Sequence, residues 1–425
     1  MLAERAFGIK TKVYTCIILW FHSYTAMVSY MTIVKNELPE VLLTIFRFTS
    51  NDCNIHENTW WTDGNILFTI VLIGFVMPLS SFRKIDFLSF TSAIGMFCMI
   101  CFSAIIVYHK FIITCPFEED LSSKNEEFCD FSNFTSKNSH EFSKFNEELK
   151  KDNICEVKPL QLTWSLDHVM AIPIMLFSFM CHASVLPIYA ECKPHTRKFM
   201  LKVTKTALLF CFLVYLAVGV MGYLTFRSVT IVSDVLLMYT NILPLSTPIM
   251  IARICSLVCV IFSAPLLHFP CRKALTMLLF PDKPFSWSIH LSIMLFNLIL
   301  VFVNVYGLGQ SLGNLLSYGG IIAGNSLILI LPNLFYLKLC SVETLSQAGT
   351  QEKLLLNGET VEIKLVGVHY DQRRRSSAIL PEHRSETRKV ISKIIIVVGV
   401  VNFMVSISLQ IYKDFFDHSE KQENH

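Results

Sequence analysis

The sequence predicts an all-α polytopic membrane protein, and three observations support this prediction. Of the 425 residues, 53% are hydrophobic and only 16% are charged, and the mean hydropathy is +0.51. The apolar residues gather in separate runs, each comparable to the roughly 20 residues that cross about 30 Å of hydrocarbon as a helix. The runs lack the alternation of a membrane barrel strand, so helices are the conformation that satisfies their backbone groups inside a bilayer.

Nine apolar runs qualify as membrane spans. They lie near residues 12–35, 64–82, 86–109, 168–190, 203–226, 247–270, 286–306, 312–337 and 390–412. If residue 1 is cytoplasmic, alternate loops hold most of the Lys and Arg, as the positive-inside rule requires. The basic positions are Arg5, Lys10 and Lys12; Arg83 and Lys84; Lys193, Arg197, Lys198, Lys202 and Lys205; and Arg272, Lys273 and Lys283. With nine spans, the C-terminus lies on the extracellular side.

The polar segments divide the chain further. A membrane core covers residues 1–337, a polar cytoplasmic loop covers 338–389, and a tail of residues 413–425 follows the last span. The run Arg373-Arg374-Arg375-Ser376-Ser377 in that loop resembles a basophilic kinase site or a contact for anionic lipid. Such runs more often act only as topology determinants.

The loop of residues 110–166 is long and hydrophilic, and this topology places it outside the cell. Asn133 begins an Asn-Phe-Thr tripeptide, an N-glycosylation acceptor that is usable only on the lumenal side. Four of the 14 cysteines also fall outside, namely Cys53, Cys115, Cys129 and Cys155. An oxidising compartment favours disulfides, and four cysteines permit three pairings. Cys115 with Cys155 is the preferred pair because it ties the base of the loop together.

The sequence contains no metal-type cluster of His and carboxylates, no nucleotide-binding glycine loop and no nucleophile with an evident base. An intramembrane enzyme is therefore not expected, and no cofactor or metal centre is expected. What remains is the kind of helix interruption from which transporters build binding sites at mid-membrane. In the span 168–190, Pro173 and Pro187 bracket a polar cluster that includes Ser178, Cys181 and His182. The alternative is a kinked packing helix, because a proline in a helix also serves that purpose.

Other polar side chains within the spans have expected roles as well. Arg253 lies early in the span 247–270 and could sense charge near the outer mouth, but snorkelling toward the interface is its expected role. Asn304, Asn325 and Asn333 are expected to form hydrogen bonds between helices, the commonest use of Asn in a membrane bundle.

Several ordered blocks of this sequence resemble one family. The most specific is Phe177-x-Phe179-x-Cys181-His182 followed by Leu186-Pro187-Ile188-Tyr189. Others are Glu37-Leu38-Pro39-Glu40, Gly222-Tyr223-Leu224-Thr225-Phe226, Pro265-Leu266-Leu267-His268-Phe269-Pro270 and Cys115-Pro116 with Cys155. They resemble the sodium-coupled neutral amino acid transporters of systems A and N, which are solute carrier family 38 within the amino acid/auxin permease group. The matches extend over the whole chain apart from parts of the two long loops.

The resemblance implies a LeuT-like bundle of eleven spans with two inverted five-helix repeats. Nine of the eleven spans are expected here, because the chain aligns from just before the third span onward. The first and sixth spans of such carriers unwind around the substrate, so the resemblance implies that Phe177, Ser178, Cys181 and His182 line the substrate side. It also implies that Ser263 contributes a hydroxyl to a sodium site.

Some positions depart from the family pattern. Ile261 stands where other members have a threonine of the sodium site, so sodium coupling is less firmly predicted than transport. His22-Ser23 replaces a Gln-Asn pair of the third span. The stretch from Gly320 to Asn325 is bulkier than the small and hydroxyl residues that the family has near the pathway.

The expected function is secondary active transport of small neutral amino acids of the glutamine or alanine type by alternating access. Sodium is the expected coupling ion, and a proton-driven or facilitative carrier is the nearest alternative. A different class of function is a truncated, non-transporting isoform that acts as an amino acid sensor or regulatory partner, and an incomplete gene model is a third possibility. The expected partners are an amino acid and the lipid bilayer, without nucleic acid, and the plasma membrane is the expected location. The oligomeric state stays open.

Overall fold

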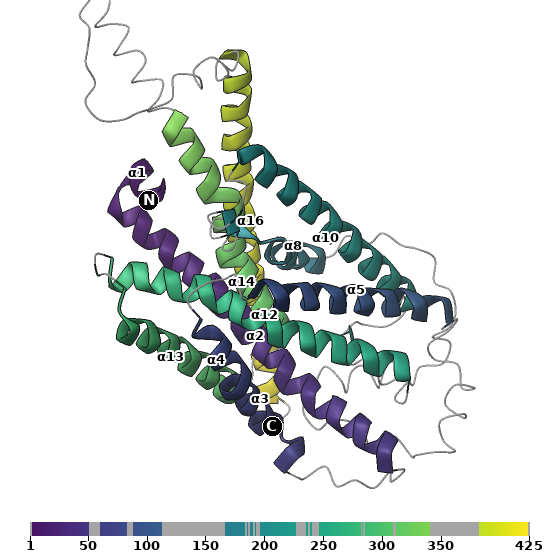
Figure 1. Ribbon diagram of the computed structural model, residues 1–425. Coiled ribbons are helices and arrows are strands. Elements are labelled where there is room, and N and C mark those ends of the chain that lie inside the picture. The colour runs from purple at the N-terminus through teal and green to yellow at the C-terminus, as the bar shows by residue number, and fades with distance from the viewer. Residues whose placement is uncertain are drawn as a thin grey trace, which may run out of the picture.

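The computed structural model describes nine stretches of the chain and a few single residues between them. These stretches are 2–50, 60–82, 88–112, 166–182, 196–226, 246–281, 285–308, 312–340 and 382–423. Every regular element within them is a helix, and seven helices are long and apolar enough to cross a membrane. The predicted class, an all-α polytopic membrane protein, is therefore confirmed (Figure 1).

Helices lie over each of the nine predicted spans. They are α2 (Ile9–Ser50); α3 (Gly64–Val71), η2 (Leu72–Val76) and α4 (Met77–Ser80); α5 (Leu88–Ile112); α8 (Leu166–Ser178); α10 (Arg197–Thr225); α12 (Thr247–Leu279); α13 (Trp287–Val303) and η4 (Asn304–Leu308); α14 (Leu312–Gly319) and η5 (Gly320–Ile330); and α16 (Glu382–Glu423). Two short helices, α1 (Leu2–Phe7) and η1 (Trp60–Thr62), precede α2 and α3. Helices α2, α12 and α16 extend past the predicted spans, because a helix continues beyond the hydrocarbon wherever its sequence permits.

The centre of the bundle is the crossing of α2 and α12, and α5 packs against α12 as well (Figure 1). Met27 and Met31 of α2 join Phe68 of α3, Ala264 of α12 and Met294 of α13 in one buried apolar cluster. The marked N- and C-terminal ends lie at opposite ends of the bundle in Figure 1.

Serine and threonine hydroxyls of α2 form hydrogen bonds within that helix. The Ser23 hydroxyl donates to the Leu19 carbonyl at 3.0 Å, and the Thr25 hydroxyl donates to the Phe21 carbonyl at 2.9 Å. An unpaired polar group in hydrocarbon costs several kcal/mol by order of magnitude, about as much as a whole packed side chain contributes. Back-bonding to the preceding turn therefore lets α2 contain polar residues in the middle of a membrane bundle.

Helix α10 has the opposite character, because its apolar surface is uncovered. Leu209, Phe212 and Leu213 are all exposed, and no residue is buried in the most apolar 18-residue stretch of α10. In a soluble protein such a surface would drive aggregation, whereas acyl chains cover it in a bilayer. We therefore assign α10 to the lipid-facing side of the bundle.

The C-terminal end of α4 is held by side chains from two other helices. Arg272 of α12 donates to the carbonyl oxygens of Ser80 at 2.7 Å and Phe82 at 3.3 Å. Nε2 of His290 in α13 lies 3.1 Å from the Ser81 carbonyl oxygen and 3.0 Å from Nη1 of Arg272. Arg272 and His290 thus satisfy terminal carbonyls that have no partner within the helix itself.

Arg253 does not snorkel, so that prediction is wrong. Its guanidinium is buried between α12 and α2, where Nε lies 3.5 Å from Oε2 of Glu37 and Nη1 lies 4.0 Å from Oε2 of Glu40. The side chains of Arg253 and Glu37 are only 2% and 3% exposed. The carboxylates of Glu37 and Glu40 lie three residues apart on α2 and balance the charge of the buried guanidinium. Arg253 therefore joins α12 to α2.

The three asparagines behave differently from one another. The amide oxygen of Asn325 in η5 accepts from Nδ2 of Asn402 in α16 at 2.8 Å, so the prediction of a bond between helices is confirmed there. Nδ2 of Asn333 donates to the Leu329 carbonyl of its own helix at 2.8 Å, so the prediction is wrong for Asn333. Asn304 belongs to the cavity described next.

Candidate functional site

The predicted span 168–190 is interrupted near its middle, as its prolines indicate. Helix α8 ends at Ser178, and residues 180 and 181 lie outside any helix. The amide of Met180 donates to Phe177 across only three residues at 3.1 Å, and four-residue bonding resumes with Val185 donating to Cys181 at 3.1 Å. Within the described residues, the regular four-residue hydrogen bonding of α8 is therefore interrupted at Met180.

A backbone carbonyl at this interruption is bound by a neighbouring helix. The carbonyl oxygen of Ser178 accepts from the hydroxyl of Tyr215 in α10 at 3.4 Å. The ring of Tyr215 also packs edge-to-face on Phe179, with centroids 5.2 Å apart. Tyr215 thus fastens the end of α8 to the lipid-facing helix α10.

Replacing Tyr215 with phenylalanine is expected to lower stability only slightly. The change removes one long hydrogen bond and keeps the ring contact, so we expect a loss of about 0.5–1.5 kcal/mol. The measurement is thermal unfolding of the purified protein in detergent. Tyr223→Phe, at another exposed tyrosine of α10, is the matched control and should leave the melting temperature unchanged. Equal losses in both variants would contradict the role of the Tyr215 hydroxyl.

Glycines allow the interrupted helix to lie directly against η5. A Cβ atom added to Gly320 would overlap the carbonyl oxygen of Pro173 in α8. A Cβ atom on Gly319 would come within 2.7 Å of the Phe177 ring, closer than real Cβ atoms approach. Small residues permit close helix approach in membranes, where packing rather than the hydrophobic effect drives association. The broken helix α8 therefore packs closely on Gly319 and on the first turn of the π-helix η5.

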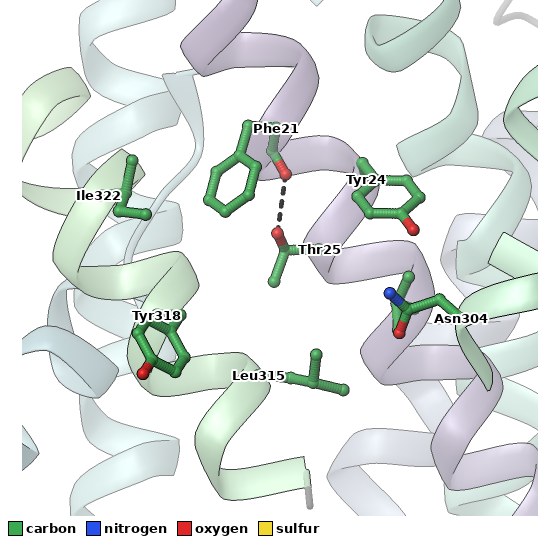
Figure 2. A pocket seen from close by; sticks show the side chains of 8 residues that line it. Phe21, Tyr24, Thr25, Asn304, Leu315, Tyr318 and Ile322 are labelled. Carbon is green, nitrogen blue, oxygen red and sulfur yellow. Dashed lines mark hydrogen bonds between the residues drawn. The ribbon is translucent and has the colours of Figure 1, made fainter. Parts of the chain in front are cut away.

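A cavity of about 260 Å³ lies between α2 and the α14–η5 segment (Figure 2). Its lining residues are Phe21, Tyr24, Thr25, Val28, Asn304, Leu315, Tyr318 and Ile322. The four from α2 follow the spacing i, i+3, i+4, i+7 and therefore share one face of the helix. The volume lies just below the roughly 300–1,000 Å³ that is typical of small-molecule sites, which suits a small solute.

The lining of the cavity is aromatic and uncharged. The Tyr24 hydroxyl donates to the Leu300 carbonyl at 3.3 Å, and the Thr25 hydroxyl is engaged by the backbone of α2. The amide of Asn304 enters the cavity from η4 (Figure 2). Because the lining contains no ionised side chain, the cavity favours an apolar or neutral polar group over a charged one.

The four predicted substrate residues lie at the break but outside the lining of this cavity. Ser178 and His182 are exposed, while Phe177 and Cys181 are partly buried. The Ser178 hydroxyl donates to the Ile174 carbonyl at 2.9 Å, so it is engaged by its own helix. The structure therefore gathers these four residues at the break, beside the cavity and not within it.

Phe177 connects the break to the cavity wall. Its ring packs edge-to-face on His22 of α2, with centroids 5.1 Å apart. The same ring and Cγ2 of Thr25 both approach Gly319, the last residue of α14. Since Thr25 lines the cavity, Phe177 supports that wall from behind, and a movement of the broken helix would reach the cavity through it.

Ser263, the predicted ion ligand, lies at a close approach of α12 and α5. Its hydroxyl is 3.9 Å from the Cys259 sulfur, and a Cβ atom on Gly95 of α5 would lie 3.7 Å from it. In the described residues, no three His, Cys, Asp or Glu side chains form a group that could hold a metal ion. Asn133, Cys115 and Cys155 lie outside the described residues.

The sequence reasoning missed the residues that line the cavity. Aromatic and apolar residues within a span are usually read as packing or lipid-facing positions, so Phe21, Tyr24 and Tyr318 did not stand out. The helical spacing of Phe21, Tyr24, Thr25 and Val28 is a usable signal, because it places two aromatic rings and a hydroxyl on one face. Nothing in the sequence marks Ile322 as a cavity residue.

The chain resembles known proteins over most of its length. The family model described as "Transmembrane amino acid transporter protein" matches residues 1–138 and 147–361. A zebrafish (Danio rerio) protein named sodium-coupled neutral amino acid symporter 2 is 32% identical over 344 residues, which are 81% of this chain and 64% of that protein. Human sodium-coupled neutral amino acid transporter 4 is 32% identical over 382 residues, with 81% of this chain and 67% of that protein covered.

The chain spans about two thirds of the length of the curated relatives that it matches. Within that length, the family match includes α8 with its break, both cavity walls and Ser263. The relatives are transporters and not enzymes, in agreement with the expectation from the sequence. This chain is accordingly a member of the transmembrane amino acid transporter family, in the group of the sodium-coupled neutral amino acid transporters.

Proposed function

We propose that this chain moves small neutral amino acids of the glutamine or alanine type across a membrane by alternating access, with sodium as the coupling ion. The observation that supports this most strongly is the interruption of the predicted span after Ser178, where α8 ends and Met180 bonds across only three residues, in a chain of this family. An amino acid carries an ammonium group and a carboxylate. Unpaired backbone carbonyls and amides at a helix break can bind both groups at mid-membrane.

The neighbouring cavity suits the rest of such a solute. Phe177, Ser178, Cys181 and His182 bind the amino acid backbone in this proposal, while the aromatic cavity receives its uncharged side chain. A rocking movement of the broken helix passes through Phe177 to the wall at Thr25. Ser263 supplies one hydroxyl oxygen to the sodium site, and the remaining oxygens come from other groups.

The proposed arrangement in the cell follows the distribution of charge. The N-terminus and the 338–389 loop face the cytoplasm, and the 110–166 loop and the C-terminus lie outside, in the plasma membrane. Asn133 is the proposed glycosylation site of the outer loop, and Cys115 with Cys155 is its proposed disulfide. The division into a membrane core of residues 1–337 and a last span near 390–412 is part of the same proposal.

Uptake of radiolabelled glutamine and alanine in expressing cells tests the function directly. We expect uptake above that of untransfected cells in sodium medium, and a fall of at least about tenfold when choline replaces sodium, because the ion gradient drives transport. Surface biotinylation of the same cells controls for delivery. Absence of uptake in both media, with normal surface delivery, would refute the carrier function. Equal uptake in both media would refute sodium coupling alone.

A further inference from the structure

The last helix, α16, carries a polar stripe along one face of an otherwise apolar span. Asn402, Ser406, Gln410 and Asp414 follow one another at intervals of four residues and therefore lie on one side of the helix. Ser406 and Gln410 are each only 1% exposed, whereas Met404 on another face is 60% exposed. The polar residues thus turn inward, and the apolar residues turn outward toward lipid.

This stripe pairs with α14 and η5 through side-chain hydrogen bonds. Asn402 donates to Asn325 at 2.8 Å, and the Ser317 hydroxyl donates to Oε1 of Gln410 at 2.8 Å. Nε2 of Gln410 donates in turn to Oδ1 of Asp414 at 3.1 Å. Asn402 pairs with Asn325, whereas Gln410, farther along α16, pairs with Ser317, so the two segments run antiparallel and are fixed in register.

The stripe ends on a residue of the cavity wall. Oδ2 of Asp414 accepts a hydrogen bond from the hydroxyl of Tyr318, which lines the cavity. In Figure 2 the Tyr318 hydroxyl points away from the middle of the cavity, so the ring and not the hydroxyl borders the space. An ionisable residue on the inner side of a membrane helix ordinarily marks a functional position, and Asp414 is partly buried near the C-terminal end of the span. Here Asp414 has two partners, Tyr318 and Gln410, and both lie in the stripe network.

We propose that Asp414 is a positioning residue that sets the side-chain selectivity of the cavity through Tyr318. The inference rests on the proposed function and names a determinant that lies outside the cavity. By accepting a hydrogen bond from the Tyr318 hydroxyl, Asp414 holds the Tyr318 ring back against α16 and keeps the full width of the cavity open. Gln410 fixes the rotamer of Asp414, and Ser317 fixes Gln410, so the last helix acts on the cavity through a short chain of hydrogen bonds.

Loss of the carboxylate has a specific consequence. The Tyr318 hydroxyl is left without its acceptor in a largely apolar setting, and the ring is free to swing toward the amide of Asn304 across the cavity. A narrower cavity still admits alanine and excludes the longer side chain of glutamine. Selectivity among neutral amino acids therefore changes, whereas a mere loss of packing would lower transport of both substrates alike.

The experiment compares KM for glutamine and alanine in Asp414→Ala, Tyr318→Phe and the double variant. We expect KM for glutamine to rise about tenfold in each single variant, the lower end of what a one-methylene misfit does to selectivity, and KM for alanine to rise clearly less. The double variant is expected to resemble either single variant, because both changes break the same contact. Asp414→Asn keeps an acceptor oxygen and is expected to restore most of the glutamine KM.

Asn402→Ala is the matched control, because it removes a hydrogen bond of the same stripe that does not reach the cavity. It is expected to lower the amount of protein at the surface without changing the ratio of the two KM values. Additive effects of Tyr318→Phe and Asp414→Ala would overturn the proposal. So would an altered KM ratio in Asn402→Ala, because α16 would then act only as a general support.

A second measurement does not depend on transport. Fluorotyrosine incorporated at position 318 gives a ¹⁹F resonance that reports the hydrogen bond of the phenol. We expect Asp414→Ala to shift this resonance and Asn402→Ala to leave it in place. If the wild-type protein transports no amino acid but Asp414→Ala shifts the resonance, the proposed function fails, while the hydrogen bond between Tyr318 and Asp414 is supported. If transport is normal and the resonance does not move, the positioning role fails alone.

Discussion

Replacing Arg253 with alanine is expected to destabilise the bundle by about 3–5 kcal/mol, the usual result of leaving a buried charge without its partner. The guanidinium lies between Glu37 and Glu40 of α2, and both Arg253 and Glu37 are almost completely buried. Without Arg253 the Glu37 carboxylate would lose this ion pair in the interior of the bundle. Thermal unfolding in detergent, followed by the amount of monodisperse protein that remains, measures the loss.

A second variant separates charge from packing. Arg253→Gln combined with Glu37→Gln removes both charges and keeps polar side chains at both positions, so we expect it to be more stable than Arg253→Ala alone. Arg253→Lys keeps the charge but not the forked geometry, and an intermediate loss is expected. If Arg253→Ala melts at the same temperature as the wild type, the buried ion pair does not hold α2 to α12.

Replacing Gly320 with alanine is expected to have the second largest effect. The added methyl group would overlap the carbonyl oxygen of Pro173, which is main chain and cannot rotate away. Overpacking ordinarily costs about 1–3 kcal/mol, and we expect a loss at the upper end of that range because α8 or η5 must move as a whole. The measurement is the melting temperature, together with amino acid uptake per molecule at the surface.

Gly219→Ala is the matched control for this change. Gly219 lies inside α10, and no heavy atom comes within 4 Å of the position that its Cβ would occupy. Alanine is the better helix former by about 1 kcal/mol, so this variant is expected to be neutral or slightly stabilising. A Gly320→Ala protein that is as stable as Gly219→Ala would mean that the close approach to Pro173 is dispensable.

The spans and the break could be predicted because both depend on local sequence. Hydrocarbon imposes a length of about 20 apolar residues on each crossing segment, whatever its neighbours are. Proline removes a hydrogen bond wherever it stands in a helix, so Pro173 and Pro187 indicated the interruption without knowledge of packing. The π-helical turns of η5 were not predictable, and neither was the close approach of Gly320, their first residue, to α8.

Contacts between distant segments set the limit of sequence reasoning. Arg253 was expected to reach the interface because an arginine in a span usually does so, and only the fold brings Glu37 within 3.5 Å of it. Asp414 was assigned to the tail because the apolar run ends near residue 412, yet it binds Tyr318. The four-residue spacing of Asn402, Ser406, Gln410 and Asp414 was visible in the sequence. The residues of α14 and η5 with which this face of α16 pairs were not.

The segment formed by α3, η2 and α4 is short for a span, and its two ends are closed by polar groups. Asp63 caps its start by accepting from the amide of Asn65 at 2.8 Å, and Arg272 with His290 closes its end. At about 1.5 Å per residue it rises only about 25 Å, less than the roughly 30 Å of a typical hydrocarbon layer. The headgroups must therefore dip inward at this corner, a dimple whose elastic cost grows with the thickness of the host membrane. On this account the host membrane thins locally around α3, η2 and α4, so that the short segment still crosses it.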